Sequence, residues 1–435
     1  MHERNLFCKN PPDFKALALK YKSFAEHARF DGSLDFQDAA ALRALTTTLL
    51  EDGFGLKVQL PKDRLCPPVP NRLDYMLWLQ DLLDSTEPSC ETKAGEEREN
   101  GPCVLDIGTG ASAIYPLLGC ALRPTWSFIA TDIDGDSIVG ARQSVALNGL
   151  EDRIRLLNTR VEDKLINLDA WGVKMLDAVM CNPPFYDSAE DMQKSESVKE
   201  EQPFAALTAT KNELITPGGE LAFIRRILAE SRTLGTRVLW YTSLCGHLST
   251  LQEISRELSE ANMNYGVGEF VQARTKRWVI GWSFRPYRPD DETARHAARS
   301  ESGTIWLGKK CKLPPSTIFS FMLRQKQDLV DVKAKLVKAT DEVDVRLEWE
   351  DLDQDHRIAK GFANVNTWSR SARRKRKRDE EAEPMPEAKA KDEVDANFGF
   401  TIELRGYTVK IRWTQGFDKL VYESFCGWVK RALDT

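Results

Sequence analysis

The stretch PCVLDIGTGAS, residues 102–112, indicates the fold class more directly than any other part of the chain. A short apolar run leads into a loop that contains Gly108 and Gly110, and the helix-compatible stretch YPLLGCALR follows at 115–123. Glycines let the backbone turn sharply and approach a ligand closely. A strand, a glycine loop and a helix in this order are typical of nucleotide-binding sheets, although a plain tight strand-to-helix turn has the same pattern.

Short apolar runs alternate with helix-compatible segments over residues 102–286. The pattern predicts strands in PCVLDIG (102–108), WSFIATDID (126–134), IRLLN (154–158), LDAVMCN (176–182), GELAFIRRI (219–227), RVLWYTSL (237–244) and RWVIGWSF (277–284). Helices are predicted between most of them, at 137–148, 204–214, 228–234 and 250–262. Such β-α alternation predicts an α/β domain with a doubly wound, mainly parallel sheet and helices on both faces.

Residues 1–85 predict a helical module that precedes this domain. Apolar side chains recur at helical spacing from Phe14 to Phe24, and 35–50 continues the pattern. After three prolines, RLDYMLWLQDLL (72–83) predicts an amphipathic helix. An acidic insert, 86–101, then separates the helical module from the sheet.

The region after the sheet predicts a small α+β module, formed by 303–368 and 397–435. Its expected elements are a helix at 314–325, a strand at 343–349, a hairpin at 399–413 that turns near Gly406, and a closing helix at 417–433. The stretch 369–396 changes from basic to acidic and predicts a disordered linker.

Composition narrows the class of protein. The chain has 435 residues, 42% hydrophobic and 29% charged, which is typical of two or three globular domains. No apolar run approaches the roughly 20 residues of a membrane helix, so we expect no membrane partner. Nine cysteines without a C-x-x-C pair and five scattered histidines predict reduced thiols and no metal site. The net charge of −5 comes mainly from acidic tracts. The rest of the chain is closer to neutral or basic, so it remains compatible with a nucleic-acid partner.

Acidic residues at the ends of the first strands predict a cofactor site. Asp106 ends the first strand, and Asp132 ends the second, 24 residues past Gly108. A carboxylate at the latter position accepts hydrogen bonds from a ribose diol, which fits NAD or S-adenosylmethionine. Glu162 and Asp163, after the third strand, either face an adenine amino group or form a solvated acidic loop.

The stretch CNPPFYDS (181–188) predicts the chemistry. Asn182 follows the fourth strand at the sheet edge where such folds bind ligands. Pro183 and Pro184 lack backbone donors, so the Asn182 side-chain oxygen and the Pro183 carbonyl can both accept hydrogen bonds from a planar NH₂ group. Phe185 and the tyrosine after it can stack on the heterocycle that carries the amine. A methyl transfer to that amine requires correct positioning of the reactants rather than a general base. The alternative interpretation is that N-P-P forms an ordinary turn without a catalytic role.

Basic residues near the expected pocket predict contacts with nucleic acid. The candidate substrate-binding residues are Tyr186, Arg4, Lys9, Arg225, Arg226, Arg274, Lys276 and Arg277. Separately, seven of the ten residues from 369 to 378 are basic. This run predicts binding of the nuclear import machinery through 370–378, with nonspecific RNA contact as the second interpretation. We therefore expect the protein in the nucleus, with the cytoplasm as a second location.

The chain resembles the methyltransferase-like protein 16 family, U6 small nuclear RNA adenine-N6 methyltransferases with bacterial relatives that act on 23S ribosomal RNA. The resemblance covers about residues 1–285. It rests on HERNLF (2–7), PPDF (11–14), RALTTTLLEDGFGL (43–56), RLDY (72–75), DIGTGASAIYPLLG (106–119), CNPPF (181–185), GGELAFIRRI (218–227) and ARTKRWVIGWSF (273–284). The chain departs from the Lys-Thr of that family at Glu162-Asp163, and its segment 187–203 is acidic.

The resemblance implies a class I, Rossmann-like methyltransferase with a seven-stranded sheet and bound S-adenosylmethionine, in which the helical module helps to form an RNA groove. It implies cofactor contacts from Arg72, Gly108, Ser112 and Asp132, to which the strand and loop pattern adds Asp106, Gly110, Asp163 and Asn182. It also implies that Asn182, Pro183, Pro184 and Phe185 form the catalytic loop.

Three functions remain open at this stage. The first is adenine-N6 methylation of a structured RNA, most directly U6 small nuclear RNA, with ribosomal RNA or messenger RNA hairpins as alternatives. The second is N5-methylation of a protein glutamine, since the same loop can hold a side-chain amide. The third is a non-catalytic RNA-binding protein built on a methyltransferase fold.

Overall fold

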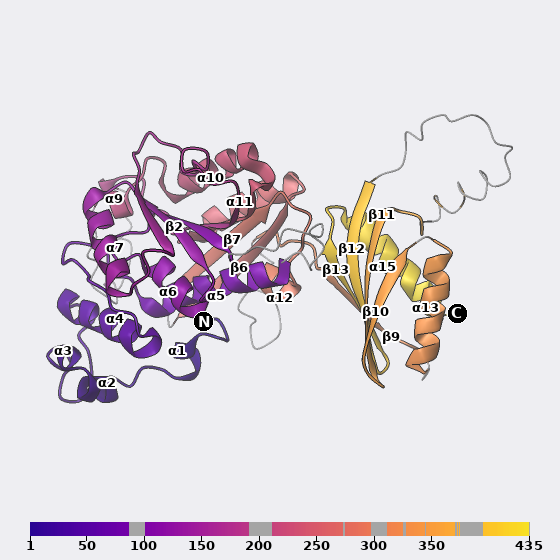
Figure 1. Cartoon of the computed structure of the whole chain (residues 1–435), viewed down its shortest axis with the longest axis horizontal. Coiled ribbons are helices and arrows are strands. Elements are labelled where there is room, and N and C mark those ends of the chain that lie inside the picture. Colours follow the sequence, from indigo (N-terminus) through magenta and orange to yellow (C-terminus); the bar gives the residue numbers. More distant parts are fainter. Residues whose placement is uncertain are drawn as a thin grey trace. The chain divides into compact units, whose positions relative to one another are not determined.

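The computed structural model describes residues 1–86, 101–190, 211–272, 275–296, 311–324, 328–343, 345–369 and 395–434, with Ala372 and Arg374. Two compact units are resolved (Figure 1). Unit 1 comprises Met1–Asp84, Ser89–Phe284 and Arg295–Leu313, and unit 2 comprises Ser85–Pro88, Arg285–Ala294 and Pro314–Thr435, as far as their residues are described. Unit 1 therefore holds both the N-terminal helices and the sheet expected over 102–286.

Unit 1 is built on one large sheet, which is mainly parallel. Its strands are β1 (Cys103–Ile107), β2 (Ser127–Asp132), β3 (Ile154–Asn158), β4 (Leu176–Cys181), β5 (Val238–Cys245), β6 (Asn264–Gln272), β7 (Thr275–Ser283) and the two-residue β8 (Arg295–His296). Their order across the sheet is β3-β2-β1-β4-β5-β7-β6-β8. In this order across the sheet, each neighbouring pair from β3 through β2, β1 and β4 to β5 is parallel. Strand β7 is antiparallel to both of its neighbours, β5 and β6. The seven-stranded α/β prediction is confirmed, with β8 as a short addition.

Helices cover both faces of this sheet. The helices of unit 1 are α1 (Leu6–Lys9), α2 (Phe14–Lys20), α3 (Lys22–Ala25), α4 (Ala39–Phe54), α5 (Val69–Thr86), α6 (Ile114–Leu122), α7 (Gly135–Leu147), α9 (Lys211–Leu214), α10 (Gly219–Leu234), the 3₁₀ turn η1 (Gly235–Arg237) and α11 (Leu248–Glu260). Helices α10 and α11 pack on one face, and α5 and α6 pack on the other, where Trp78 meets Gly281 and Gly119 meets Phe128.

Helix α5 is buried rather than amphipathic, contrary to the prediction for 72–83. Nearly every side chain from Arg72 to Leu83 is buried, with Tyr75 and Trp78 fully so. The Tyr75 hydroxyl lies 2.7 Å from the Thr242 hydroxyl of β5 and accepts the Cys181 N–H at 3.3 Å. The helix thus joins the N-terminal segment to the centre of the sheet.

Two predictions of local structure in unit 1 were wrong. GELAFIRRI, predicted as a strand, is the first part of helix α10, because Ile224, Ile227 and Leu228 form one buried helical stripe. Strand β6 was missed, because its sequence NYGVGEFVQ is interrupted by two glycines and a glutamate. Its Glu269 is buried and accepts a hydrogen bond from Trp278 Nε1 at 3.2 Å, which only the pairing with β7 makes possible.

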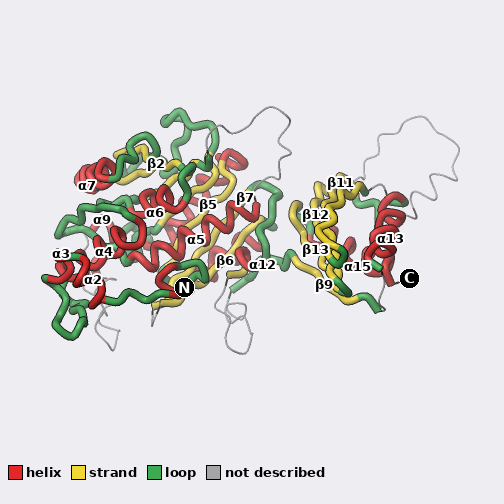
Figure 2. The backbone as a smooth tube through the Cα atoms, turned by 60° about the horizontal axis from the view of Figure 1, so that its bottom comes forward, coloured by secondary structure: helices red, strands yellow, loops and turns green. Residues whose placement is uncertain are grey.

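Unit 2 is an antiparallel sheet with two helices on one face (Figure 2). Its strands are β9 (Ile318–Met322), β10 (Arg346–Asp353), β11 (His356–Val365), β12 (Asp395–Arg405) and β13 (Thr408–Gln415), in the order β10-β11-β12-β13-β9. Its helices are α12 (Asp291–Ala294), α13 (Leu329–Asp341) and α15 (Lys419–Asp434), and the latter two cover a core rich in aromatic residues. The hairpin at Gly406 and the closing helix are confirmed. The helix expected at 314–325 is wrong, because that segment contains the edge strand β9.

Several expectations concern residues that lie mostly outside the described ones: the acidic insert 86–101, the acidic segment 187–203, the predicted helix 204–214, the linker 369–396 and the basic run 370–378. In the part of the chain that is described, we find no helix with the length and apolar character needed to span a bilayer.

Candidate active site

The glycine loop after β1 begins the site. Gly108 and Gly110 have φ values of 72° and 66°, a region that favours glycine. The N–H groups of Gly108 and Thr109 both donate to the Thr131 carbonyl at 2.9 Å, which fastens the loop to the end of β2. The local sequence thus positions a backbone turn at the carboxyl edge of the sheet, where parallel α/β folds bind ligands.

A pocket opens over this edge. Its lining includes seven of the eight predicted cofactor residues: Arg72, Gly108, Gly110, Ser112, Asp132, Asp163 and Asn182. Pro184 of the predicted catalytic loop and Arg226 also line it. Glu162 does not, so of the predicted acidic pair after the third strand only Asp163 lines the pocket.

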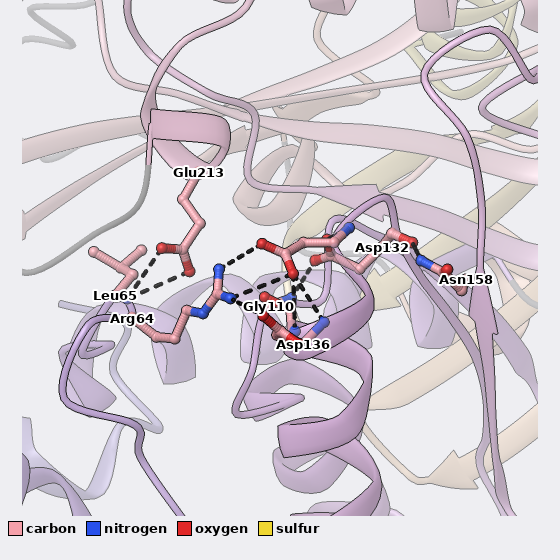
Figure 3. A network of polar contacts seen from close by, with 9 residues as sticks. Arg64, Leu65, Gly110, Asp132, Asp136, Asn158 and Glu213 are labelled. Carbon is pink, nitrogen blue, oxygen red and sulfur yellow. Dashed lines mark hydrogen bonds and ion pairs between the residues drawn. The ribbon is translucent and has the colours of Figure 1, made fainter.

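Asp132 is held in place by backbone donors (Figure 3). Its Oδ2 accepts the Gly110 N–H and its Oδ1 accepts the Asp134 N–H, both at 2.9 Å. Burial raises the pKa of this carboxyl, and the two backbone hydrogen bonds act against the rise. Each carboxylate oxygen has two lone pairs, so a ribose diol in the pocket can still donate to Asp132.

Asp106 lies beneath the glycine loop and does not line the pocket. It is fully buried, and both its carboxylate oxygens and the Thr109 hydroxyl lack a partner in good hydrogen-bond geometry among the described residues. Burial raises the pKa of Asp106 to about 7, the nearby Asp132 adds to the rise, and Thr109 and Arg72 oppose it. A buried acceptor without a donor is costly, and the α-ammonium group of S-adenosylmethionine is a donor of the right charge.

This pKa makes cofactor binding sensitive to pH. We expect the affinity for S-adenosylhomocysteine to rise as the pH increases through about 7, because the ionised Asp106 attracts an ammonium group. The folding stability of the cofactor-free chain depends on pH in the opposite direction. The pKa of Asp106 in the folded chain exceeds the value of about 3.9 in unfolded chains, so folding stability falls as the pH rises from about 4 to about 7.

Thermal unfolding with and without S-adenosylhomocysteine, across that pH range, measures both effects. Asp106→Asn should remove the pH dependence of binding. An unchanged pH profile in this variant would show that another group titrates.

The predicted catalytic loop follows β4. Oδ1 of Asn182 is buried and has no hydrogen-bond partner among the described residues. Beyond the prolines, the chain is anchored to the segment after α9: Tyr186 N–H donates to the Leu214 carbonyl, and Thr216 N–H donates to the Tyr186 carbonyl, both at 2.9 Å. The loop is therefore rigid at both ends and carries an open acceptor in its middle.

Two arginines from other elements lie near the site: Arg72 lines the pocket, and Arg277 lies beside the predicted catalytic loop. Arg72 of α5 is buried, and its guanidinium lies 5.5 Å from the centre of the Tyr115 ring. Arg277 of β7 lies over the Phe185 ring at 5.6 Å. Burial and the charge of Arg72 lower the pKa of Arg277.

Sequence reasoning missed a clamp formed by Arg64, Leu65 and Glu213 (Figure 3). Arg64 Nη1 donates to Asp134 Oδ2 at 2.5 Å, and the Leu65 N–H donates to the Glu213 carboxylate at 3.2 Å. Leu65 and Glu213 both line the pocket. The segment between α4 and α5 thereby closes one side of the site. It has no periodicity and no motif, so nothing in the sequence indicated this role.

The predicted substrate-binding residues fall into different surroundings. Arg225 and Arg226 lie within helix α10, not at the end of a strand as predicted. Arg226 donates to the carbonyls of Val161 and Asp163, which braces the pocket loop. Arg225 pairs instead with Glu253 and Glu257 of α11.

The other basic residues are also scattered. Arg4 pairs with Asp81, Lys276 lies 3.3 Å from Glu269, and Lys9 is exposed. Arg274 lies outside the described residues. Among the predicted basic residues that the structure describes, only Arg277 has a guanidinium over an aromatic ring of the predicted catalytic loop.

The donor and acceptor groups of the pocket fit S-adenosylmethionine. Asp132 and Asp163 line the pocket with carboxylate acceptors, and Asn182 Oδ1 is an unpaired buried oxygen on its wall. Asp106, one residue before the lining residue Ile107, holds two more buried oxygens without a partner among the described residues. Among the described residues no group of three or more His, Cys, Asp or Glu side chains could hold a metal ion.

Comparisons with known proteins agree with this geometry. A family described as RNA methyltransferase matches residues 1–286. The "U6 small nuclear RNA (adenine-(43)-N(6))-methyltransferase" of Schizosaccharomyces pombe is 33% identical over 404 residues, which cover 93% of this chain and 96% of that protein. The human "RNA N(6)-adenosine-methyltransferase METTL16" is 37% identical over 295 residues, 65% of this chain and 50% of that protein. The chain thus spans about half the length of its human relative.

Solved structures give the same result for the fold. The human METTL16 catalytic domain in complex with the MAT2A 3′UTR hairpin 1 has a TM-score of 0.57 at 35% identity and covers 65% of this chain and 95% of that one. The N-terminal domain of human METTL16 in complex with SAH has a TM-score of 0.53 at 35% identity and covers 65% and 98%.

Proposed function

Since this chain belongs to the RNA methyltransferase family and uses S-adenosylmethionine as its methyl donor, we propose that it methylates N6 of an adenine in a structured RNA. One observation carries the choice of atom. The Asn182 side-chain oxygen is a buried acceptor that has no donor in the described part of the chain, and it lies near Pro184 on the pocket wall. An exocyclic amine supplies the missing donor.

The residues of the loop position this amine. Asn182 Oδ1 accepts one N–H and the Pro183 carbonyl accepts the other, which directs the nitrogen lone pair toward the pocket. Phe185 and Tyr186 stack on the adenine ring. Bound S-adenosylmethionine supplies an electrophilic methyl group. Because the amine loses its proton after the transfer, the protein contributes orientation and exclusion of water rather than a base.

The proposed target is U6 small nuclear RNA. The S. pombe relative is named for this substrate, and its match is too long to be confined to unit 1, so it extends into unit 2. A messenger RNA hairpin is the second candidate, because the human structures contain such hairpins. A small nuclear RNA substrate places the protein in the nucleus, with the basic run 370–378 as its import signal.

Methyl transfer to total small RNA tests the proposal. The full chain is incubated with isotope-labelled S-adenosylmethionine and the RNA, and the nucleosides are then separated and the modified site is mapped. We expect N6-methyladenosine at one position of U6. Label on protein instead of RNA would favour the glutamine alternative, which amino-acid analysis of the labelled protein would check, and no label on any macromolecule would overturn the proposal.

Arg277 is expected to contact RNA phosphate, and Arg225 provides a matched control. Arg277→Glu should weaken RNA binding and reduce the slope of log K against log salt by about 1, the change for one lost phosphate contact. Arg225→Glu changes the charge equally, but Arg225 is paired with two glutamates on the α10–α11 surface. Its effect on the slope should therefore be small. Titrations at several salt concentrations measure both, and equal slopes for the two variants would contradict the assignment.

A further inference from the structure

The stretch Gly218-Gly219-Glu220 begins GGELAFIRRI (218–227), one of the stretches that carry the family resemblance, but it lies outside the lining of the cofactor pocket. It begins helix α10 directly behind the catalytic loop. The Gly218 N–H donates to Asp187 Oδ1 at 2.5 Å. Gly219 has a φ of 64° and lies so close to the loop that a Cβ there would be 3.7 Å from the Phe185 carbonyl oxygen. The start of α10 therefore supports the backbone that follows Phe185.

Glu220 extends this support to the loop after β5. Its side chain is buried, and Oε1 accepts the Gly246 N–H. Oε2 accepts the His247 N–H at 3.1 Å and the Thr250 hydroxyl at 3.1 Å, and it lies 2.9 Å from His247 Nδ1. A buried carboxylate is tolerated only when it is hydrogen-bonded. These four contacts satisfy it and fix the position of Gly246.

Gly246 in turn contacts the catalytic aromatic ring. A Cβ at this position would lie 2.5 Å from Cδ1 and 2.7 Å from Cε1 of Phe185, so only glycine fits against the ring. Arg277 lies over the same ring. The Phe185 side chain is therefore bounded by Gly246 and Arg277, while its backbone rests on Gly219.

We propose that Gly218-Gly219-Glu220 and Gly246 form a buttress that sets the position of Phe185, with Glu220 as a positioning residue for adenine stacking. This inference rests on the proposed function, in which Phe185 contacts the target base. Glu220 lies outside the pocket lining and acts through Gly246. The buttress sets how precisely the adenine is held and leaves the cofactor site unchanged.

Two single variants test the buttress. Glu220→Gln keeps the shape of the side chain but replaces one carboxylate oxygen with an NH₂ group. Some of the N–H and O–H donors around Glu220 then lose their acceptor. Gly246→Ala adds one methyl group against the ring. Each should lower kcat by about 10²-fold, the scale expected for a misplacement of about 1 Å. The Kd for S-adenosylhomocysteine should change less than about twofold, because neither residue lines the cofactor pocket.

Gly119→Ala is the matched control. Gly119 of α6 also packs against a phenylalanine, and its Cβ would lie 2.2 Å from Cζ of Phe128, away from the catalytic loop. This variant should lower the melting temperature while kcat per folded enzyme stays unchanged. If it loses kcat as Gly246→Ala does, disturbed packing anywhere in the unit affects catalysis and the buttress is not specific.

A double-mutant cycle with Phe185→Ala distinguishes positioning from general structural damage. Once the ring is absent, Glu220→Gln and Gly246→Ala should cause little further loss of kcat. Full additivity with Phe185→Ala would overturn the buttress. Failure of the proposed function is a different outcome, since the wild-type chain would then transfer no methyl group to RNA.

Discussion

Replacing Asn182 with alanine is expected to lower kcat for RNA methylation by about 10³-fold, the scale of loss when one preorganised hydrogen-bonding group is removed from a reacting centre. The buried Oδ1 is the acceptor that orients the amine. RNA affinity should remain nearly unchanged, because phosphate contacts supply most of it. Single-turnover methylation and RNA binding, measured on the same preparation, separate the two quantities.

Asn182→Asp is the informative companion variant. It keeps an oxygen acceptor in the same place, so it should retain more activity than Asn182→Ala. Equal losses in the two variants would argue against a hydrogen bond to the amine. A loss of RNA binding with normal kcat at saturating RNA would assign Asn182 to substrate capture instead.

Replacing Asp132 with asparagine is expected to weaken S-adenosylhomocysteine binding by about 10- to 100-fold. A hydrogen bond to a charged group contributes about 1.5–3 kcal/mol, and the amide oxygen of asparagine can replace only one of the two carboxylate oxygens. Both oxygens are already oriented by the N–H groups of Gly110 and Asp134, so the carboxylate is preorganised for a diol. Calorimetric titration measures the Kd.

Asp152→Asn removes the same charge from an exposed position after α7 and serves as the control. Its Kd should match the wild type within about twofold. RNA affinity without cofactor should be normal in both variants. If Asp132→Asn binds the cofactor normally, the ribose lies elsewhere in the pocket.

Much of the candidate site was predictable because its chemistry is local. Gly108 and Gly110 adopt a backbone conformation that their own residue type favours, and Asn182 follows directly on a buried strand. Residues at the ends of parallel strands meet at one sheet edge whatever the helices do. The predicted residues therefore lie together even though their segments are far apart in sequence.

Other predictions failed because burial depends on distant partners. The apolar positions of GELAFIRRI fit a short strand or a helix, and the sheet face that receives Ile224 and Ile227 decides between them. Arg225 and Arg226 are adjacent and chemically equal, yet one braces the pocket loop and the other pairs with α11. The two side chains have different partners because consecutive side chains on a helix point in directions about 100° apart.

By itself, the sequence determined the α/β class, the glycine loop, the carboxylates of the cofactor pocket and the Asn-Pro-Pro-Phe loop, because these depend on residue type and on order along the chain. Only the tertiary structure decided that Leu65 and Glu213 meet at the pocket and that Glu220 reaches Gly246. Those contacts join segments that carry no periodic signal, and a side chain's partner across the fold is set by packing rather than by its neighbours in sequence.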